Sequence, residues 1–165
     1  HQTAWGTSCN GQFSIMDLAH EFKTNTLQLR FDEFKLKPPP IGSQVGDPFW
    51  WSFHTAFHIT VAEVLEIPRR DIETSFRSQS QDTAQGELIV FDRIPGGAGY
   101  VESVIEQLPK ILDRMIELTE KCENPNCEDE GSCYACLRSY GNQFYWDRLN
   151  RRIVYRWLKT WVSNH

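Results

Sequence analysis

The sequence has no run of about 18 apolar residues, so it contains no candidate transmembrane helix. Its N-terminus lacks the charged start and the apolar stretch of a signal peptide. The chain begins with His1 rather than methionine, and we therefore expect it to be an excerpt or a processed fragment of a larger protein. We expect a single domain over residues 1–165, a cytoplasmic location and no membrane partner.

Nucleotide-binding motifs are also missing. The glycine-rich stretch Pro95-Gly-Gly-Ala-Gly-Tyr100 follows a predicted strand, but no Gly-Lys-Ser/Thr comes after it and the dinucleotide spacing is absent. Backbone amides in a turn between a strand and a helix can contact an anion, and Gly96, Gly97 and Gly99 are the candidates. The alternative is a tight strand-to-helix corner in which side chains would clash.

The composition is that of a globular protein, with 40% hydrophobic and 13% aromatic residues. The net charge of −5 is unevenly distributed. Residues 1–137 carry 11 Lys and Arg against 21 Asp and Glu, a net charge of −10, whereas residues 138–165 carry six against one, a net charge of +5. An acidic body is a poor general partner for a phosphate backbone, while the basic C-terminal segment can contact nucleic acid or an acidic partner.

Four of the five cysteines, Cys122, Cys127, Cys133 and Cys136, fall within fifteen residues as a Cys-x4-Cys and a Cys-x2-Cys pair. Two such pairs on one folded-back loop can supply four thiolates to a tetrahedral zinc ion, at about 2.3 Å each. Four sulfur ligands favour a closed, structural site over a catalytic one. Two disulfides are the main alternative, but they need an oxidising compartment. The remote Cys9 is interpreted as incidental.

Periodicity predicts strands and helices along the chain, and the cysteine pairs predict a four-cysteine zinc loop at 122–143. Pro109 predicts a kink or two shorter helices within one helical segment. Asp47 is a plausible N-cap for the first amphipathic helix. The expected elements are a strand from residue 26, a loop at 35–47, a helix at 48–66, a loop or short strand pair at 71–86, a strand at 87–92, and helices at 100–120 and 146–162.

His54 and His58 lie four residues apart on the predicted helix, a spacing that can bind a metal. No glutamate accompanies them in the required position and aromatic residues surround them, so we interpret them as core or surface histidines. An enzyme built on these histidines and Asp92 would need a paired base and nucleophile or an open metal site, and the sequence provides neither. We therefore expect no enzymatic activity in this chain.

A basic stripe recurs every three or four residues on the predicted C-terminal helix. Such a stripe is usually solvated surface, but it is also the segment best able to engage a phosphate backbone, with polar residues nearby for base or sugar contacts. The candidate nucleic-acid contacts are Arg148, Arg152, Arg156, Lys159, Asn142 and Gln143.

Three blocks occur in a fixed order along the chain. They are Leu18-Ala-His-Glu-Phe-Lys-Thr24, then Phe91-Asp-x-x-Pro-Gly-Gly-Ala-Gly-Tyr100, and then the cysteine pairs followed by Leu137-Arg-Ser-Tyr-Gly-Asn-Gln143 and Leu149-Asn-Arg151. With these blocks, residues 12–160 resemble the MrfA-like zinc-binding domain. This domain is the cysteine-rich C-terminal module of DEAD/DEAH-box helicases linked to DNA repair, and of a component of the DISARM anti-phage system.

The resemblance implies a mixed α+β fold, in which a small sheet packs with several helices, and a place in the C-terminal part of a larger protein. It also implies that Cys122, Cys127, Cys133 and Cys136 bind Zn²⁺ and that the domain supports a helicase core or a partner subunit. No Walker motif and no DEAD/DEAH box occur here, so ATP hydrolysis and unwinding cannot reside in these residues. Two hypotheses follow. The first is a non-catalytic, structural-zinc accessory domain of a superfamily 2 helicase-type protein, with DNA as a further contact. The second is an assembly module of an anti-phage complex that makes no direct nucleic-acid contact.

Overall fold

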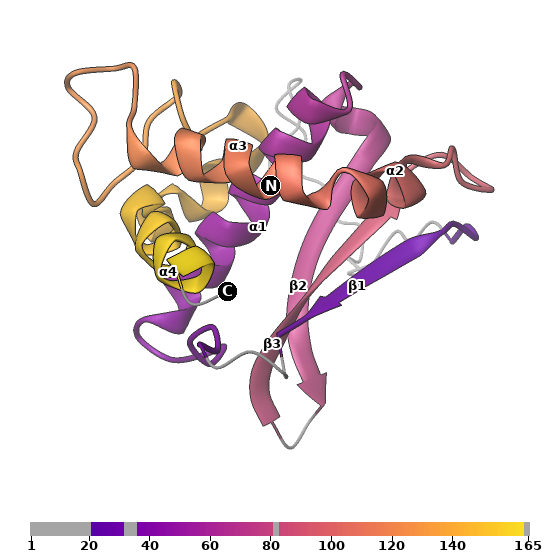
Figure 1. Cartoon of the computed structure of the whole chain (residues 1–165), viewed down its shortest axis with the longest axis horizontal. Coiled ribbons are helices and arrows are strands. Elements are labelled where there is room, and N and C mark those ends of the chain that lie inside the picture. Colours follow the sequence, from indigo (N-terminus) through magenta and orange to yellow (C-terminus); the bar gives the residue numbers. More distant parts are fainter. Residues whose placement is uncertain (1–20, 32–35, 81–82, 164–165) are drawn as a thin grey trace, which may run out of the picture.

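The computed structural model describes residues 21–31, 36–80 and 83–163 (Figure 1). Over these residues an antiparallel three-stranded sheet packs with four α-helices and two 3₁₀ segments, which confirms the predicted α+β class. Cys9 and the first residues of the Leu18–Thr24 block lie outside the described residues. The elements are β1 (Thr26–Arg30), α1 (Gly46–Val64), η1 (Arg69–Asp71), β2 (Ile72–Ser80), β3 (Thr83–Asp92), α2 (Tyr100–Glu106), α3 (Leu108–Glu120), η2 (Tyr140–Arg148) and α4 (Arg151–Ser163).

The sheet has the order β1-β3-β2, with all neighbours antiparallel. The expected strand at residue 26 is confirmed as β1, but the loop or short strand pair expected at 71–86 is in fact part of a long hairpin. Its strand β2 has nine residues and β3 has ten. The strand pattern is weak in the sequence because serine, threonine and glutamine are frequent there. In the structure, Ile72, Thr74 and Phe76 alternate along β2 on the side of α1. Phe76 stacks on Trp50 of α1, with ring centroids 6.0 Å apart.

Glu87 sits at the middle of the other face of the sheet. The strand register places it directly between Arg30 of β1 and Arg77 of β2. Arg30 Nε donates to its carboxylate at 2.7 Å and Arg77 Nε at 2.8 Å, and the Glu87 side chain has no exposed surface. Burial opposes ionisation of Glu87, but the hydrogen bonds from Arg77 and Arg30 outweigh it and hold its pKa below the ordinary value.

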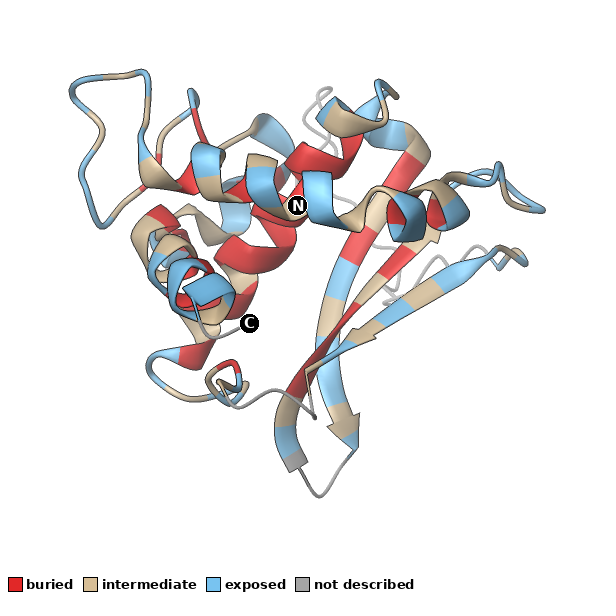
Figure 2. Cartoon of the chain, in the orientation of Figure 1, coloured by how far each residue is buried: buried red, intermediate tan, exposed pale blue. Residues whose placement is uncertain are grey.

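Helix α1 forms the centre of the core and contacts β2, α3, α4 and η2. The expected amphipathic helix is present, but it is buried nearly all round, as the red ribbon in Figure 2 shows. The helix begins at Gly46, and Val45 rather than Asp47 is its N-cap. Asp47 lies in the first turn, where its carboxylate accepts a hydrogen bond from the Gly42 amide at 3.0 Å. The predicted cap was therefore wrong by two residues, because the carboxylate serves the preceding turn.

The helical segment at 100–120 divides into α2 and α3 at Gln107, with Pro109 in the first turn of α3, which confirms the predicted break. The C-terminal helix begins at Arg151 instead of residue 146. The residues before it form η2, in which Asn142 and Tyr145 depart from helical geometry. Within the described residues, no helix is both long and apolar enough to cross a membrane.

Candidate metal centre

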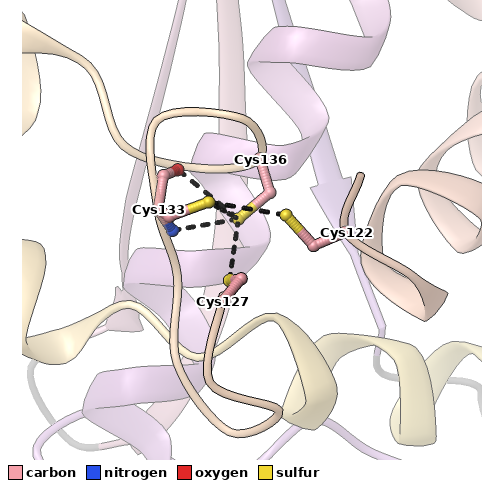
Figure 3. Close-up of side chains that lie close together, drawn as sticks. All are labelled: Cys122, Cys127, Cys133 and Cys136. Atoms are coloured by element: carbon pink, nitrogen blue, oxygen red, sulfur yellow. Dashed lines mark hydrogen bonds between the residues drawn. The ribbon is translucent and has the colours of Figure 1, made fainter. Parts of the chain in front are cut away.

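The four clustered cysteines meet in space. Their sulfur atoms all lie within 4.8 Å of one another on the loop between α3 and η2 (Figure 3). The Cys122 and Cys133 sulfurs are 3.4 Å apart, and Cys136 lies 3.9 Å from both Cys127 and Cys133. A tetrahedron of thiolates at about 2.3 Å from a metal has edges of about 3.8 Å. These three separations lie within about 0.4 Å of that edge length, and the remaining ones do not exceed 4.8 Å.

The local sequence explains why the loop closes. Asn124 accepts hydrogen bonds within the first pair, from the Asn126 amide to its side chain and from the Cys127 amide to its carbonyl, each at 3.0 Å. In the second pair the Cys133 carbonyl accepts from the Cys136 amide at 3.1 Å, and the Cys133 amide lies 3.1 Å from the Cys136 sulfur. Two tight turns therefore direct the four side chains toward one point.

The environment of the thiols differs from one to the next. Burial raises the pKa of Cys136 to about 12 and also raises that of Cys127. Burial opposes ionisation of Cys133 as well, but a hydrogen bond from the Ala135 amide and further bonds from Cys122, Cys127 and Asn124 lower its pKa to about 7. Without a metal, the cluster therefore holds protons that a bound cation would displace.

The donor set fits a closed zinc site. Four sulfur donors at the corners of one tetrahedron satisfy the usual coordination number of zinc, and no fifth side chain of the described residues joins the group. The disulfide alternative does not describe this arrangement, because the described cysteines are free and their sulfurs are separated by far more than the ~2.05 Å of a disulfide bond.

Arg151, at the start of α4, fastens the cysteine loop to the rest of the domain. Its side chain is 6% exposed, and its guanidinium donates to the carbonyls of Thr119 and Glu120 at 3.2 and 2.9 Å. The same group contacts the Asp129 carboxylate of the loop at 3.2 Å. Among the sequence signals, only the quoted Leu149-Asn-Arg151 block includes this arginine, and nothing in the sequence indicates its contact with the loop.

Two members of the predicted basic stripe face the same acidic loop. Arg152 Nε lies 3.3 Å from Asp129, and Arg156 Nη2 lies 2.6 Å from Glu130. Arg152 also donates to the Glu120 carbonyl at 3.1 Å. Both cations are therefore engaged within the chain, and Arg152 also complements the negative C-terminal end of α3.

The other candidate nucleic-acid contacts lie apart from this loop or inside the fold. Arg148 and Lys159 are exposed and have no ion pair among the described residues, although each lies over an aromatic ring. Gln143 is exposed as well. Asn142 is buried, where it donates to the Leu137 carbonyl at 2.8 Å and accepts from the Trp146 indole at 2.7 Å. The Asn142 side chain therefore stabilises η2 from inside the fold.

The glycine-rich turn wraps around the buried carboxylate of Asp92. Its Oδ2 accepts from the Ala98 amide at 2.6 Å, from the Gly99 amide at 3.1 Å and from the Tyr100 amide at 3.4 Å. The amides of Gly96 and Gly97 donate to the backbone carbonyls of Lys23 and Ile94. Positive φ angles at Gly96, Gly97 and Gly99 permit this wrapping. An external anion would have to compete with Asp92 for these donors.

The side chains of the two histidines of α1 contact β2 and the turn before it, and not the cysteine cluster. His54 Nδ1 is 3.4 Å from the Thr74 hydroxyl, and His58 Nε2 lies 2.8 and 3.0 Å from the carbonyls of Arg69 and Ile72. Among the described residues, the metal-compatible group contains cysteines alone. These contacts agree with the interpretation of His54 and His58 as core or surface histidines.

Four cysteines gathered on one loop of an α+β domain define a cysteine-rich metal-binding module. The family model of the MrfA Zn-binding domain matches residues 53–137, which is more than half of the chain, and the chain belongs to this family. The matched region runs from the middle of α1 to the end of the cysteine loop. It leaves out α4 and its contacts with that loop.

Two kinds of relative extend the comparison. The chain is 27% identical over 158 residues to Druantia protein DruE of Escherichia coli (strain UMEA 4076-1). The alignment covers 88% of this chain but 8% of DruE. Crystal structures of the DUF1998 helicase MrfA bound to DNA, without and with AMPPNP, match with a TM-score of 0.55 and 16% identity. They cover 72% and 82% of this chain and 15% of MrfA. The chain thus spans a small part of each relative, and the structural likeness shows a shared fold.

Proposed function

We propose that Cys122, Cys127, Cys133 and Cys136 bind one Zn²⁺ in a closed, structural site. The single observation that carries this proposal is the match between the sulfur separations and a tetrahedron of four thiolates. The zinc would supply folding free energy, because its ligands converge only in the folded loop. The reducing environment of the cytoplasm, where we place the protein, would keep the four thiols available.

We further propose that the domain, a single unit over residues 1–165, is the accessory zinc module of a helicase-type DNA-processing protein. Membership of the MrfA Zn-binding family and the shared fold with MrfA support this role. The chain would contribute no catalysis itself and would pack against the helicase core of its parent or against a partner subunit. The alternative is an assembly module of an anti-phage complex, which the relationship to DruE favours.

Metal analysis tests the zinc proposal directly. We expect one zinc per chain by mass spectrometry, and the release of four additional reactive thiols when a chelator removes it. Cys9 provides the internal control, since its thiol should react before chelation. Absence of metal together with absence of free thiols would overturn the proposal and restore the disulfide alternative.

DNA binding separates the two candidate roles. Arg152 and Arg156 are poor probes, because their replacement would also break the ion pairs with Asp129 and Glu130. Arg148 and Lys159 are better, since both are exposed and neither holds the cysteine loop. The accessory role predicts that Arg148→Gln with Lys159→Gln weakens binding to single-stranded DNA and reduces its salt dependence. Unchanged or undetectable DNA binding favours the assembly module.

A further inference from the structure

A cavity of about 290 Å³ lies between α1, the turn that leads into β2, and η2. No cysteine lines it, so it is separate from the metal centre. Its charged lining residues are Arg69, Arg70, Arg93 and Glu73, together with the histidines of α1. Leaving the histidines aside, three cations face one anion, although the chain as a whole carries −5. The cavity is therefore a local positive site on an acidic molecule.

The guanidinium groups of this cavity are uncommitted compared with other arginines of the domain. Arg69, Arg70 and Arg93 approach carboxylates no closer than 3.7 to 3.8 Å. In contrast, Arg30 and Arg156 contact theirs at 2.7 and 2.6 Å. The three cavity arginines make no side-chain hydrogen bond to any described residue within the usual distance limits. Their donors are thus available to a ligand.

His54 adds a buried acceptor to the cavity lining. Its residue surface is 9% exposed, and the Thr74 hydroxyl donates to the His54 carbonyl at 3.0 Å. The hydroxyl proton is thereby used, so the contact at 3.4 Å between Thr74 Oγ1 and the imidazole requires Nδ1 of His54 to donate. Nε2 then carries a lone pair, and it has no hydrogen-bond partner. Nε2 has no accessible surface in this conformation, so a small movement of the surrounding side chains would let a ligand with a hydroxyl group satisfy it.

We propose that this cavity binds a phosphate group that retains a hydroxyl, either free phosphate or a terminal phosphate monoester on a nucleic acid. The guanidinium groups of Arg69, Arg70 and Arg93 would hold its oxyanions, and its P–OH would donate to Nε2 of His54. Arginine binds phosphate through two parallel hydrogen bonds from its planar guanidinium group, and three such groups line this cavity. An internal phosphodiester never carries this hydroxyl, whereas inorganic phosphate keeps one at neutral pH and a monoester, with a second pKa of about 6, keeps one in its monoanionic form.

The size of the cavity agrees with this ligand. Pockets for drug-sized molecules occupy about 300–1,000 Å³, and the present one lies at the lower limit. It therefore suits a small anionic end group better than a whole nucleotide. The inference does not depend on the zinc proposal, since none of its residues is a metal ligand.

The test compares the binding of two fluorescent single-stranded oligonucleotides, identical except for a 5′-phosphate or a 5′-hydroxyl, to the zinc-loaded chain. Inorganic phosphate serves as a competitor and as a ligand on its own. We expect at least tenfold tighter binding of the phosphorylated strand, and loss of that preference in Arg69→Gln with Arg93→Gln. The matched control, Lys37→Gln with Lys110→Gln, removes the same charge at two exposed positions elsewhere and should leave the preference intact.

The two kinds of measurement distinguish free phosphate from a nucleic-acid end as the ligand. Binding of inorganic phosphate that requires Arg69 and Arg93, without a preference between the strands, identifies free phosphate as the ligand. A preference for the phosphorylated strand identifies a nucleic-acid end. As a second readout, phosphate should shift the NMR signals of the His54 imidazole. Equal affinity for both strands together with no response to inorganic phosphate would overturn the proposal, while zinc content measured on the same samples tests the metal site separately.

Discussion

Arg151 donates a hydrogen bond to the carbonyl of Glu120 at 2.9 Å across 31 residues of sequence. Glu120 ends α3, which leads into the cysteine loop, and Arg151 opens α4, which follows it. The same guanidinium reaches Asp129 within the loop. One buried side chain therefore joins both flanking helices to the loop that carries the cysteines.

Replacing Arg151 should be costly. We expect Arg151→Met to lower the free energy of unfolding by about 3–5 kcal/mol, because it leaves buried carbonyls and a carboxylate without their donor. The matched control is Arg156→Gln, which removes an exposed ion pair with Glu130 and should cost no more than about 1 kcal/mol. Urea unfolding with saturating zinc measures both. Equal costs for the two variants would contradict the special role of Arg151.

Loss of one cysteine should remove the metal. We expect Cys133→Ala to abolish stoichiometric zinc binding and to unfold residues 122–143, with a loss of at least about 4 kcal/mol, the size typical when a structural metal is lost. Metal analysis and calorimetry provide the measurement. Cys9→Ala is the control and should retain one zinc per chain. A Cys133→Ala protein with unchanged zinc content and melting temperature would refute the site.

Zinc affinity should rise with pH. In the metal-free protein, burial raises the pKa of Cys136 to about 12 and raises that of Cys127, so both thiols are protonated at pH 7. Zinc must displace these protons, and each proton released makes the affinity about tenfold higher per pH unit. Competition with a chromophoric chelator at pH 6.5, 7.0 and 7.5 measures this slope. An affinity independent of pH would mean that the cluster does not bind zinc through these thiolates.

His54 should stay neutral well below the ordinary range. Burial, and then repulsion from His58, lower its pKa from 6.5 to about 4, although a hydrogen bond with Thr74 opposes this. The folded state thus disfavours the charged form. Its contribution to stability, about 3 kcal/mol at most, is complete above pH 6.5 and is lost as the pH falls toward 4. An NMR titration of the imidazole measures the pKa, with the urea-unfolded protein as the reference. A midpoint near 6.5 in the folded protein would contradict the burial of the ring.

Features set by short-range sequence were predictable. The cysteine spacing predicted the cluster because two tight turns suffice to bring the sulfurs together, and Pro109 predicted the division between α2 and α3. The strand at residues 87–92 was found from its apolar run. Each of these signals lies within about fifteen residues of sequence, and no tertiary information was needed.

Features set by docking were not predictable. Arg148, Arg152, Arg156 and Lys159 were interpreted as one stripe that could contact nucleic acid, because the sequence does not show that Arg152 and Arg156 pair with the acidic loop. The length of β2 was missed for a related reason. The polar residues of β2 are typical of a loop. They form a strand here because Ile72 and Thr74 are buried against α1 and because β3 pairs with β2 through backbone hydrogen bonds.

Glu87, between Arg30 and Arg77, has a consequence for how sequences of this family can vary. A neutral residue at this position would leave two guanidinium groups facing each other across the sheet, with a buried site between them. Substitution of the glutamate should therefore be tolerated only when both arginines change with it. Across homologues, the three positions on three strands should covary as a unit, and a chain that kept the arginines but lost the acid would be the rare combination.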